Sequence, residues 1–281
     1  MSEKSRHIGY KKCRGGRIVV LEILGEHNEE RENVVDKRFA EMRCSKARVM
    51  RIYDMHDTSI EYEEAFSIYD KSFRYEVGKV VRQKGPFRKD LEVVRRPGIR
   101  YFLCEEPAHA WRYTPHNGLS KSWYNNGSIS TRYTYKDGKL DGLCESFHCN
   151  DQMYVCTTYK NGKKNGMYEK WYKNGQIENR CTYKDGKMNG LCKTWYENDQ
   201  MYERCTYKDG KMNGMYELWY NSGQLAKRCT YKDGKKDGLS IIWYENGRMH
   251  ARCTFKNGNP NGLYELWNED GSVNEELTRV Y

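Results

Sequence analysis

Short runs of apolar and polar residues fill the C-terminal half of the chain, and the same pattern of residue types restarts every 24 residues. In one unit, residues 215–220 and residues 224–231 form two strand-like stretches that contain aromatic and apolar side chains. A turn at 221–223 separates the two runs, and a second turn at Asp233-Gly234 ends the unit. Two glycine-containing turns in 24 residues exclude a helix. The pattern therefore predicts one β-hairpin per unit.

The same residue types recur in columns over about seven units, which is the signature of a repeat architecture. Aromatic residues 24 positions apart form one column at Trp123, Phe147, Trp171, Trp195, Trp219, Trp243 and Trp267. Three further columns are apolar, beginning at Leu119, Ile129 and Tyr135. One repeat cannot bury such columns alone, so we expect neighbouring repeats to bury them together in one long antiparallel sheet. The fold class predicted is mainly β, with the array over residues 117–275.

Two kinds of turn join the predicted strands. Asn174-Gly175 represents the first kind and Asp233-Gly234 the second, and both dipeptides favour a type I′ turn with positive φ at both central residues. The chain segment from a second turn to the following first turn is longer than the segment from a first turn to the following second turn. Each unit therefore has extra length, which we place in its Lys-x-x-Gly segment. We expect the glycine there, such as Gly238, to lie at a β-bulge or a close backbone approach.

The candidate interaction surface consists of the aromatic and arginine columns, since large rings and guanidinium groups are common at binding surfaces. Its residues are Trp171, Trp195, Trp219, Trp243, Tyr172, Tyr196, Tyr220, Tyr244, Arg180, Arg204, Arg228 and Arg252. Arginine and turn lysines beside aromatic rings could follow a phosphate backbone. The alternative is a solvated face, in which Glu169 and Glu217 oppose Arg180 and Arg228 across the hairpin.

Cysteine and histidine give no catalytic or metal motif. Cys181, Cys205, Cys229 and Cys253 form a column with a spacing of about 9.5 Å, two strands apart, which is too long for a disulfide or a shared zinc ion. We therefore expect all eleven cysteines to be reduced thiols. The seven histidines are scattered, and neither a phosphate loop nor a nucleophile elbow is present. The sequence predicts a protein that is not an enzyme and has no cofactor, catalytic residue or metal site.

Ahead of the repeats, residues 8–112 differ in composition and predict a small α+β or mainly β domain. Residues 10–24, with the apolar run 18–23, are expected to form a strand, and residues 43–49 lead into another. The segments 73–81 and 97–103 follow, and a short helix is expected at 105–111. Composition adds two points. Aromatic residues make up 14% of the chain although mean hydropathy is -1.02, which suits a thin sheet that buries rings. A net charge of +10 favours acidic partners or serves solubility.

No apolar run approaches the roughly 20 residues that span a bilayer, and the first ten residues lack a signal-peptide core. We therefore expect an intracellular protein without a transmembrane segment.

One unit shows the motif residues of the repeat clearly, namely Tyr172, Asn174, Gly175, Tyr183, Gly186, Lys187 and Gly190. Through these residues the repeat resembles the MORN repeat, and most closely the variant of bacterial antitoxin-type proteins. It implies phospholipid binding, protein docking or dimerisation. Asp199, in place of a turn glycine, and Phe147-His148-Cys149, in place of Trp-Tyr, depart from the pattern.

Residues 8–112 are similar to a domain of unknown function in proteins of large DNA viruses, through the elements Y-x-V-G-x-V-V and P-G-I-x-x-F. Arg100 stands where that pattern has histidine. The resulting hypothesis is a viral scaffold for protein–protein interaction or self-association, acting in the host-cell cytoplasm or with the virion. The alternative is an adaptor for acidic partners, either anionic membrane lipid or nucleic acid.

Overall fold

The computed structural model describes residues 6–30, 34–87, 98–111, 113–275 and 278–281. The chain forms two compact units, residues 1–132 with 149–151 and residues 133–148 with 152–281. We call them the N-terminal unit and the array unit. Pro97, the first residue of a predicted strand, lies outside the described residues.

Short antiparallel strands make up most of the N-terminal unit, together with one short helix. A four-stranded sheet has the order β1-β2-β4-β7, and two further pairs are β3-β8 and β5-β6. The elements are β1 (Ile8–Lys12), the 3-10 turn η1 (Arg14–Gly16), β2 (Arg17–Ile23), β3 (Met42–Cys44), β4 (Lys46–Asp54), β5 (Glu64–Phe66), β6 (Arg74–Glu76), β7 (Val80–Arg82), β8 (Ile99–Tyr101) and α1 (Glu105–Ala110). The predicted short helix is confirmed, and the unit is mainly β.

Side chains from β2, β4 and β8 form the core of the N-terminal unit. β2 carries the run Ile18-Val19-Val20-Leu21, whose branched side chains suit a pleated, buried surface, and Val19 and Leu21 are fully buried. Tyr101 packs in the same cluster. A Cβ atom on Gly9 would lie 2.4 Å from the Tyr101 ring, so glycine at this position of β1 lets the ring approach the backbone.

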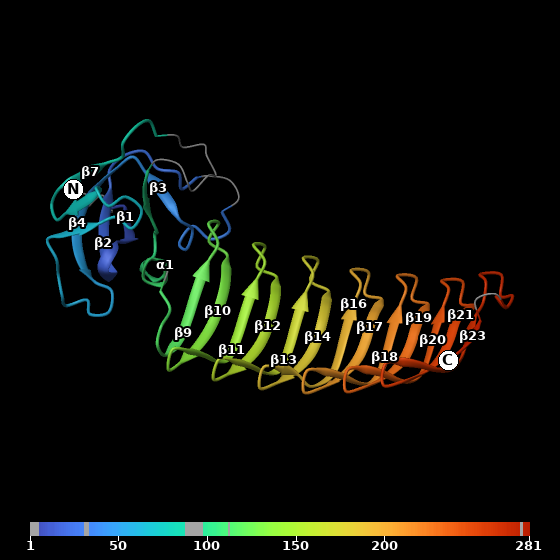
Figure 1. Ribbon diagram of the computed structural model, residues 1–281. Helices are drawn as coiled ribbons and strands as arrows, with labels where there is room; N and C mark the ends of the chain where they lie inside the picture. Colours follow the sequence, from blue (N-terminus) through green and yellow to red (C-terminus); the bar gives the residue numbers. More distant parts are fainter. Residues whose placement is uncertain (1–5, 31–33, 88–97, 112, 276–277) are drawn as a thin grey trace. The chain divides into compact units, whose positions relative to one another are not determined.

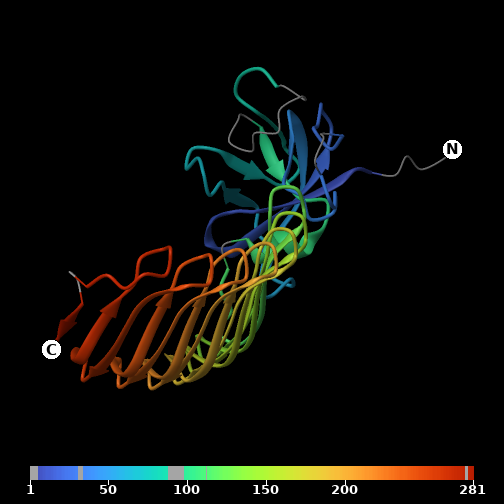
Figure 2. The same ribbon diagram turned by 90° about the vertical axis from the view of Figure 1, so that its right-hand side faces the viewer.

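The repeats form hairpins that follow one another in a 15-stranded sheet (Figures 1 and 2), in which strands are paired in chain order from β9 to β23 and β15 pairs with β14. The predicted antiparallel sheet of stacked hairpins is confirmed. Its strands are β9 (Gly118–Trp123), β10 (Ile129–Lys136), β11 (Lys139–Phe147), β12 (Met153–Lys160), β13 (Lys163–Trp171), β14 (Ile177–Lys184), β15 (Lys187–Met188), β16 (Gly190–Trp195), β17 (Met201–Lys208), β18 (Lys211–Trp219), β19 (Leu225–Lys232), β20 (Lys235–Trp243), β21 (Met249–Lys256), β22 (Asn259–Leu266) and β23 (Arg279–Val280).

The two kinds of turn lie on opposite edges of the array unit (Figure 1). At the second kind, Asp185 has φ 50° and Gly186 has φ 85°, as the predicted type I′ turn requires. At the first kind, the type I′ prediction is wrong. Gly175 has φ 85°, but Asn174 does not have positive φ, and the register shifts by one residue before Trp171. The longer loop is a type I turn followed by a left-handed glycine, which forms a bulge.

Asn174 shows why the first turn carries asparagine. Its Oδ1 accepts a hydrogen bond from the backbone N–H of Gln176 at 3.0 Å, which fixes the loop. Its Nδ2 donates to the carbonyl of Glu197, at the turn of the next repeat, at 3.3 Å. Asparagine thus closes its own turn and joins it to the next one.

The predicted bulge in the Lys-x-x-Gly segment is confirmed. Between β12 and β13 the register shifts from Thr157↔Tyr168 to Tyr159↔Lys164, so three residues of β13 oppose one residue of β12. Gly166, inside this bulge, has φ 113°. A Cβ atom there would lie 2.4 Å from Thr158 Oγ1, so both backbone conformation and space require glycine.

The array is a single-layered sheet without a thick core, so its side chains differ in how far they are buried. Cys181, Cys205, Cys229 and Cys253 are each at most 2% exposed, and the small-hydrophobe interpretation is confirmed for the three that are free thiols, Cys205, Cys229 and Cys253. The columns that begin at Ile129 and Tyr135 are half-buried, except at Val273. The column that begins at Leu119 is exposed, contrary to the expectation that neighbours bury it, because it lies on a face of the sheet that no second layer of the described residues covers.

The expectation that all cysteines are reduced is also wrong. Cys181 and Cys192 form a disulfide, with Cα atoms 4.2 Å apart. The column argument compared only cysteines two strands apart, whereas Cys192 lies on the intervening strand β16, next to the register pair Arg180↔Lys193, and is bonded to Cys181 on β14. Cross-strand neighbours lie about 4.5–5.5 Å apart, which is within disulfide range. The other nine cysteines are free thiols.

Candidate interaction surface

Tyrosines of the proposed surface connect each repeat to the next. The hydroxyl of Tyr172 donates a hydrogen bond to the backbone carbonyl of Trp195 at 2.8 Å. The same bond recurs from Tyr196 to Trp219, from Tyr220 to Trp243 and from Tyr244 to Trp267, at 2.8–2.9 Å. We call this series the tyrosine ladder. Because each hydroxyl is already bonded within the chain, the ladder tyrosines hold the array together and offer a partner mainly their rings.

His148 explains the departure of the second repeat. Its Nε2 lies 3.4 Å from the carbonyl of Trp171, at the position where a ladder tyrosine would place its hydroxyl. Histidine therefore continues the series in a repeat that has lost the tyrosine, with a side chain of similar reach.

Arginines of the proposed surface are exposed, but each is bound to a glutamate. Arg180 Nε lies 2.6 Å from Glu169, and Arg252 Nη2 lies 2.6 Å from Glu265. Glu217 binds both Arg204 and Arg228. The predicted cross-strand pairs Glu169↔Arg180 and Glu217↔Arg228 are confirmed. Since each guanidinium already has a carboxylate, this column is a weak site for a further anion.

Two positions interrupt the arginine–glutamate row. Lys193 lies between Arg180 and Arg204 in the register, at the place that Glu217 holds one repeat later. Ile241 lies between Arg228 and Arg252. The row therefore has a local excess of positive charge at Lys193 and an apolar gap at Ile241, and its charge is not uniform along the array.

The tryptophans of the proposed surface, Trp171, Trp195, Trp219 and Trp243, are half-buried. The guanidinium of Arg204 lies 5.7 Å from the centre of the Trp219 ring, within the range of a cation–π contact. The structure thus brings tryptophan and arginine together at this repeat.

Sequence reasoning missed the surface that is most apolar. A single column is 46–52% exposed on every member in the array unit, namely Leu143, Met167, Leu191, Met215, Leu239 and Leu263. We call it the apolar ridge. Its members lie two strands apart, at about 9.5 Å. The residue types are visible in the sequence, but their exposure depends on which face of the sheet is covered, and the sequence carries no signal of that.

Lysine pairs mark the edge of the array unit that carries the Asp-Gly turns. Cross-strand lysine partners flank most of these turns, as in Lys184↔Lys187 and Lys208↔Lys211. Both pairs are exposed. Where an aspartate such as Asp185 lies between the two lysines, the tip has a net charge of +1, and where Asn161 lies between Lys160 and Lys163 the net charge is +2.

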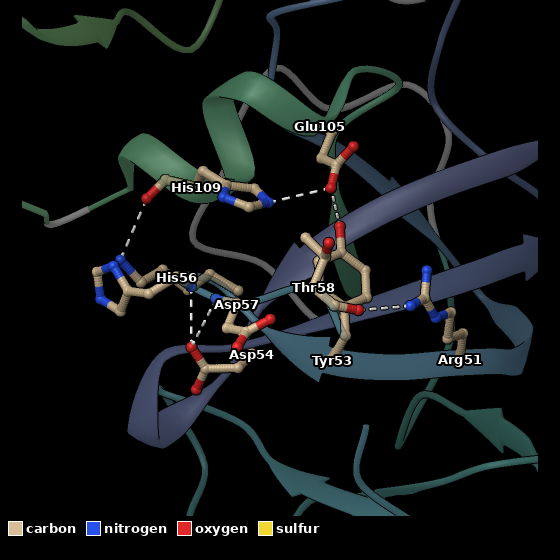
Figure 3. Close-up of polar contacts among 9 residues, drawn as sticks. Arg51, Tyr53, Asp54, His56, Asp57, Thr58, Glu105 and His109 are labelled. Carbon is tan, nitrogen blue, oxygen red and sulfur yellow. Dashed lines mark hydrogen bonds and ion pairs between the residues drawn. The ribbon is translucent and has the colours of Figure 1, made fainter. Parts of the chain in front are cut away.

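In the N-terminal unit, the carboxylate of Glu105 joins two other side chains (Figure 3). His109 Nε2 lies 3.1 Å from Glu105 Oε1, and the Tyr53 hydroxyl donates to the same oxygen. Burial raises the pKa of Tyr53, and the bond to Glu105 adds to the rise, so the phenol remains a donor. Glu105 and His109 lie on α1 and Tyr53 on β4. The contacts fasten the helix to the sheet.

A small cavity in the N-terminal unit, with a volume of about 330 Å³, includes His56 and His109 in its wall. The backbone N–H of His56 donates to Asp54 Oδ1 at 2.8 Å (Figure 3), which fixes the loop after β4. Within the described ranges, no group of three or more His, Cys, Asp or Glu side chains is placed to hold a metal ion.

Two known families match different parts of the chain. The MORN repeat variant matches residues 117–137, 164–185, 188–209, 212–233 and 236–257. The five matched repeats are MORN repeats. Residues 1–108 match a family of unknown function (DUF5758). No curated protein matches the chain. The MORN match skips the hairpin that contains His148, where the structure nevertheless forms β11 and β12.

MORN repeats fit a repeat scaffold for protein or membrane interaction, and neither matched family is described by an activity. In the part of the chain that the structure describes, no helix is both long and apolar enough to cross a membrane.

Proposed function

We propose that the protein is a non-enzymatic scaffold whose MORN array binds another protein surface through the apolar ridge, and that a second copy of the chain is one such surface. The observation that carries the proposal is the exposure of 46–52% on every ridge residue of the array unit. Apolar side chains exposed in a regular row on one face are a feature of protein–protein contacts, and here threonines such as Thr182 lie between the ridge residues. A second copy has the same 24-residue period, so its ridge has matching spacing.

Self-association is tested with a charged ridge. The variant Met167→Glu/Leu191→Glu/Met215→Glu adds three carboxylates to the ridge. A matched control adds three carboxylates at an exposed turn, Asn221→Glu/Ser222→Glu/Gln224→Glu. Sedimentation velocity at increasing protein concentration should show dimers for the wild type and the control, and monomers for the ridge variant. A wild type that stays monomeric at tens of micromolar contradicts self-association, and equal dimerisation of both variants contradicts the use of the ridge.

Lysine pairs at the Asp-Gly turns support a second candidate function, an adaptor for anionic lipid or nucleic acid. Each basic residue near an anionic membrane contributes about 1 kcal/mol, so a row of paired lysines could act together. The test is cosedimentation with phosphatidylserine vesicles and, separately, binding of single-stranded DNA. Affinity should fall steeply between about 50 mM and about 200 mM salt. Replacing Lys184, Lys187, Lys208 and Lys211 by Gln should remove most binding, whereas Arg180→Gln should have little effect.

The first proposal includes the place where the protein acts, which is a virus-infected cell. Its support is the resemblance of residues 8–112 to domains of large DNA virus proteins.

A further inference from the structure

A cavity in the N-terminal unit has a buried lysine in its wall. Its volume is about 350 Å³, and Lys11, Tyr69, Tyr75, Gln83 and Arg100 contribute to the lining. This volume is within the usual range of small-molecule sites. Lys11 lies on β1 (Figure 1) and is 6% exposed. Lysine is rarely buried to this degree without a partner for its charge.

The contacts of Lys11 within the chain leave that charge incompletely balanced. Its Nζ donates to the backbone carbonyl of Arg100 at 3.2 Å. Glu41 is the nearby carboxylate, but it also faces the guanidinium of Arg100 at 4.0 Å. Burial raises the pKa of Cys13 to about 11 and that of Cys44 to about 12. Both thiols are therefore neutral at physiological pH and supply no counter-charge.

The charged groups in the cavity wall are mostly cations. Lys11, Lys84 and Arg100 line it, with Asp70 as the one acid among the described lining residues. The Asp70 carboxylate already accepts hydrogen bonds from the backbone N–H and the hydroxyl of Ser72, at 2.9 Å and 2.6 Å. A bound anion would meet an excess of positive charge.

Aromatic rings form much of the remaining wall. Lys11 Nζ lies 6.0 Å from the centre of the Tyr69 ring and 5.9 Å from that of Tyr75. The Arg100 guanidinium lies 4.5 Å from the Tyr69 ring, and Phe73 packs at 5.1 Å against Tyr75. These faces suit a flat organic ring, because aromatic pairs favour offset or tilted contacts at this range.

Gln83 adds a polar acceptor. Its Nε2 donates to the carbonyl of Gly85 at 2.9 Å, while its buried Oε1 has no hydrogen-bond partner within the described residues. A buried acceptor without a donor is unfavourable by about 1–3 kcal/mol. A ligand with an N–H or O–H group on its ring would satisfy it.

From these contacts we propose that the cavity is a binding site for a small organic anion with a flat ring, held through Lys11 and Arg100 and stacked against Tyr69 and Tyr75. The anionic group, carboxylate or phosphate, faces the two cations, and the ring lies between the aromatic side chains. The site is separate from the array and does not depend on the scaffold function proposed for it.

Binding of phenyl phosphate to the full chain, measured by isothermal titration calorimetry, tests the site. Lys11→Met keeps the length of the side chain and should weaken binding at least about tenfold, which is about 1.4 kcal/mol. Lys12→Met is the matched control, since Lys12 is the next residue of β1 and binds the carbonyl of His109 instead. It should stay within about twofold of the wild type. No binding by the wild type, or equal binding by Lys11→Met, overturns the proposal.

Two further measurements separate the parts of the proposal. Inorganic phosphate should bind at least about tenfold more weakly than phenyl phosphate, and equal affinity overturns the stacking role of Tyr69 and Tyr75. If Lys11→Met does not fold, wild-type protein is reductively methylated with and without phenyl phosphate, and peptides are mapped by mass spectrometry. Protection of Lys11 but not of Lys12 supports the site. Equal labelling of Lys11 in both samples overturns it.

Discussion

Nε of Arg204 donates a hydrogen bond to the carboxylate of Glu217 at 2.7 Å, from a strand that neighbours the glutamate on one side. Arg228 donates to the other carboxylate oxygen at 2.9 Å from the opposite side. Glu217 itself is 1% exposed. One buried carboxylate therefore joins three strands.

Glu217→Gln should destabilise the array more than Glu265→Gln does. Replacement of Glu217 leaves two guanidinium groups without their carboxylate, whereas Glu265 serves Arg252 and its side chain is 21% exposed. Charge-assisted hydrogen bonds contribute about 1.5–3 kcal/mol, and we expect a loss in that range for Glu217→Gln. Urea unfolding followed by tryptophan fluorescence measures both variants. Equal midpoints would show that the buried position of Glu217 adds nothing.

Gly190→Ala should cost more stability than Gly186→Ala, although the two glycines lie four residues apart. Gly186 has φ 85° in an open turn, where the left-handed conformation costs alanine about 1–2 kcal/mol. Gly190 has φ 112°, and its Cβ atom would lie 2.4 Å from Thr182 Oγ1. Strain at such a conformation is about 1–3 kcal/mol, and the contact adds to it. Thermal unfolding decides the order, and a more stable Gly190→Ala protein contradicts the assigned bulge.

Peptide mapping without reductant should find Cys181 linked to Cys192 and nine free thiols. Cys205 also opposes Cys192, from β17, so an exchange to a Cys192–Cys205 bridge is geometrically close. Burial raises the pKa of Cys205 to about 11. The thiolate that would attack the bridge is therefore scarce at neutral pH. Cys205→Ser should leave the bridge unchanged and Cys192→Ser should abolish it. A Cys192–Cys205 peptide in the wild type would be evidence against this pairing.

Stability should fall as pH rises above about 9. Burial raises the pKa of Cys13 to about 11 and that of Cys44 to about 12, from 9.0. It also raises the pKa of Tyr75 and Tyr101 above 10.0. A group with a raised folded-state pKa contributes stability below its unfolded pKa, and this is lost as pH rises through the folded value, because the unfolded chain releases its proton first.

Lys11, Lys12, Lys164 and Lys236 act in the opposite direction, since burial lowers the pKa of each amine. We expect the more numerous buried thiols and phenols to outweigh these amines. Urea midpoints at pH of about 8 and about 10.5, with phenolate absorbance followed in parallel, measure the balance. Equal midpoints at the two pH values contradict it.

The array fold could be predicted because each unit repeats the same short signals. The dipeptide Asp185-Gly186 determines its turn type without help from distant residues. Gly190 lies at a bulge, which the unequal spacing of the two kinds of turn along the sequence already predicts. The type I′ prediction failed at Asn174-Gly175 because this dipeptide fits both a type I′ turn and a type I turn followed by a left-handed glycine. The number of loop residues between the last paired residues decides which of the two forms. That length depends on register, which a period-two pattern does not fix.

The candidate site was less predictable because it depends on neighbours across strands. Arg228 was expected to meet Glu217 within one hairpin, but the second arginine on Glu217 comes from the adjacent hairpin. Cys192 could have been placed opposite Cys181 only with the register known. The N-terminal unit has no internal repeat for comparison. Lys11 and Arg100 are 89 residues apart in the sequence, and no sequence pattern indicates that they lie close together in the fold.

The tyrosine ladder gives the array a direction. Each hydroxyl reaches 23 residues forward to a tryptophan carbonyl in the next repeat, so every repeat is a donor to its successor and an acceptor from its predecessor. Duplication or loss of one whole 24-residue unit would preserve each of these links, because the new neighbours present the same two groups. A gene for such an array can therefore change length in units of 72 base pairs without redesign of any junction, whereas an insertion of any other length breaks the series at one place.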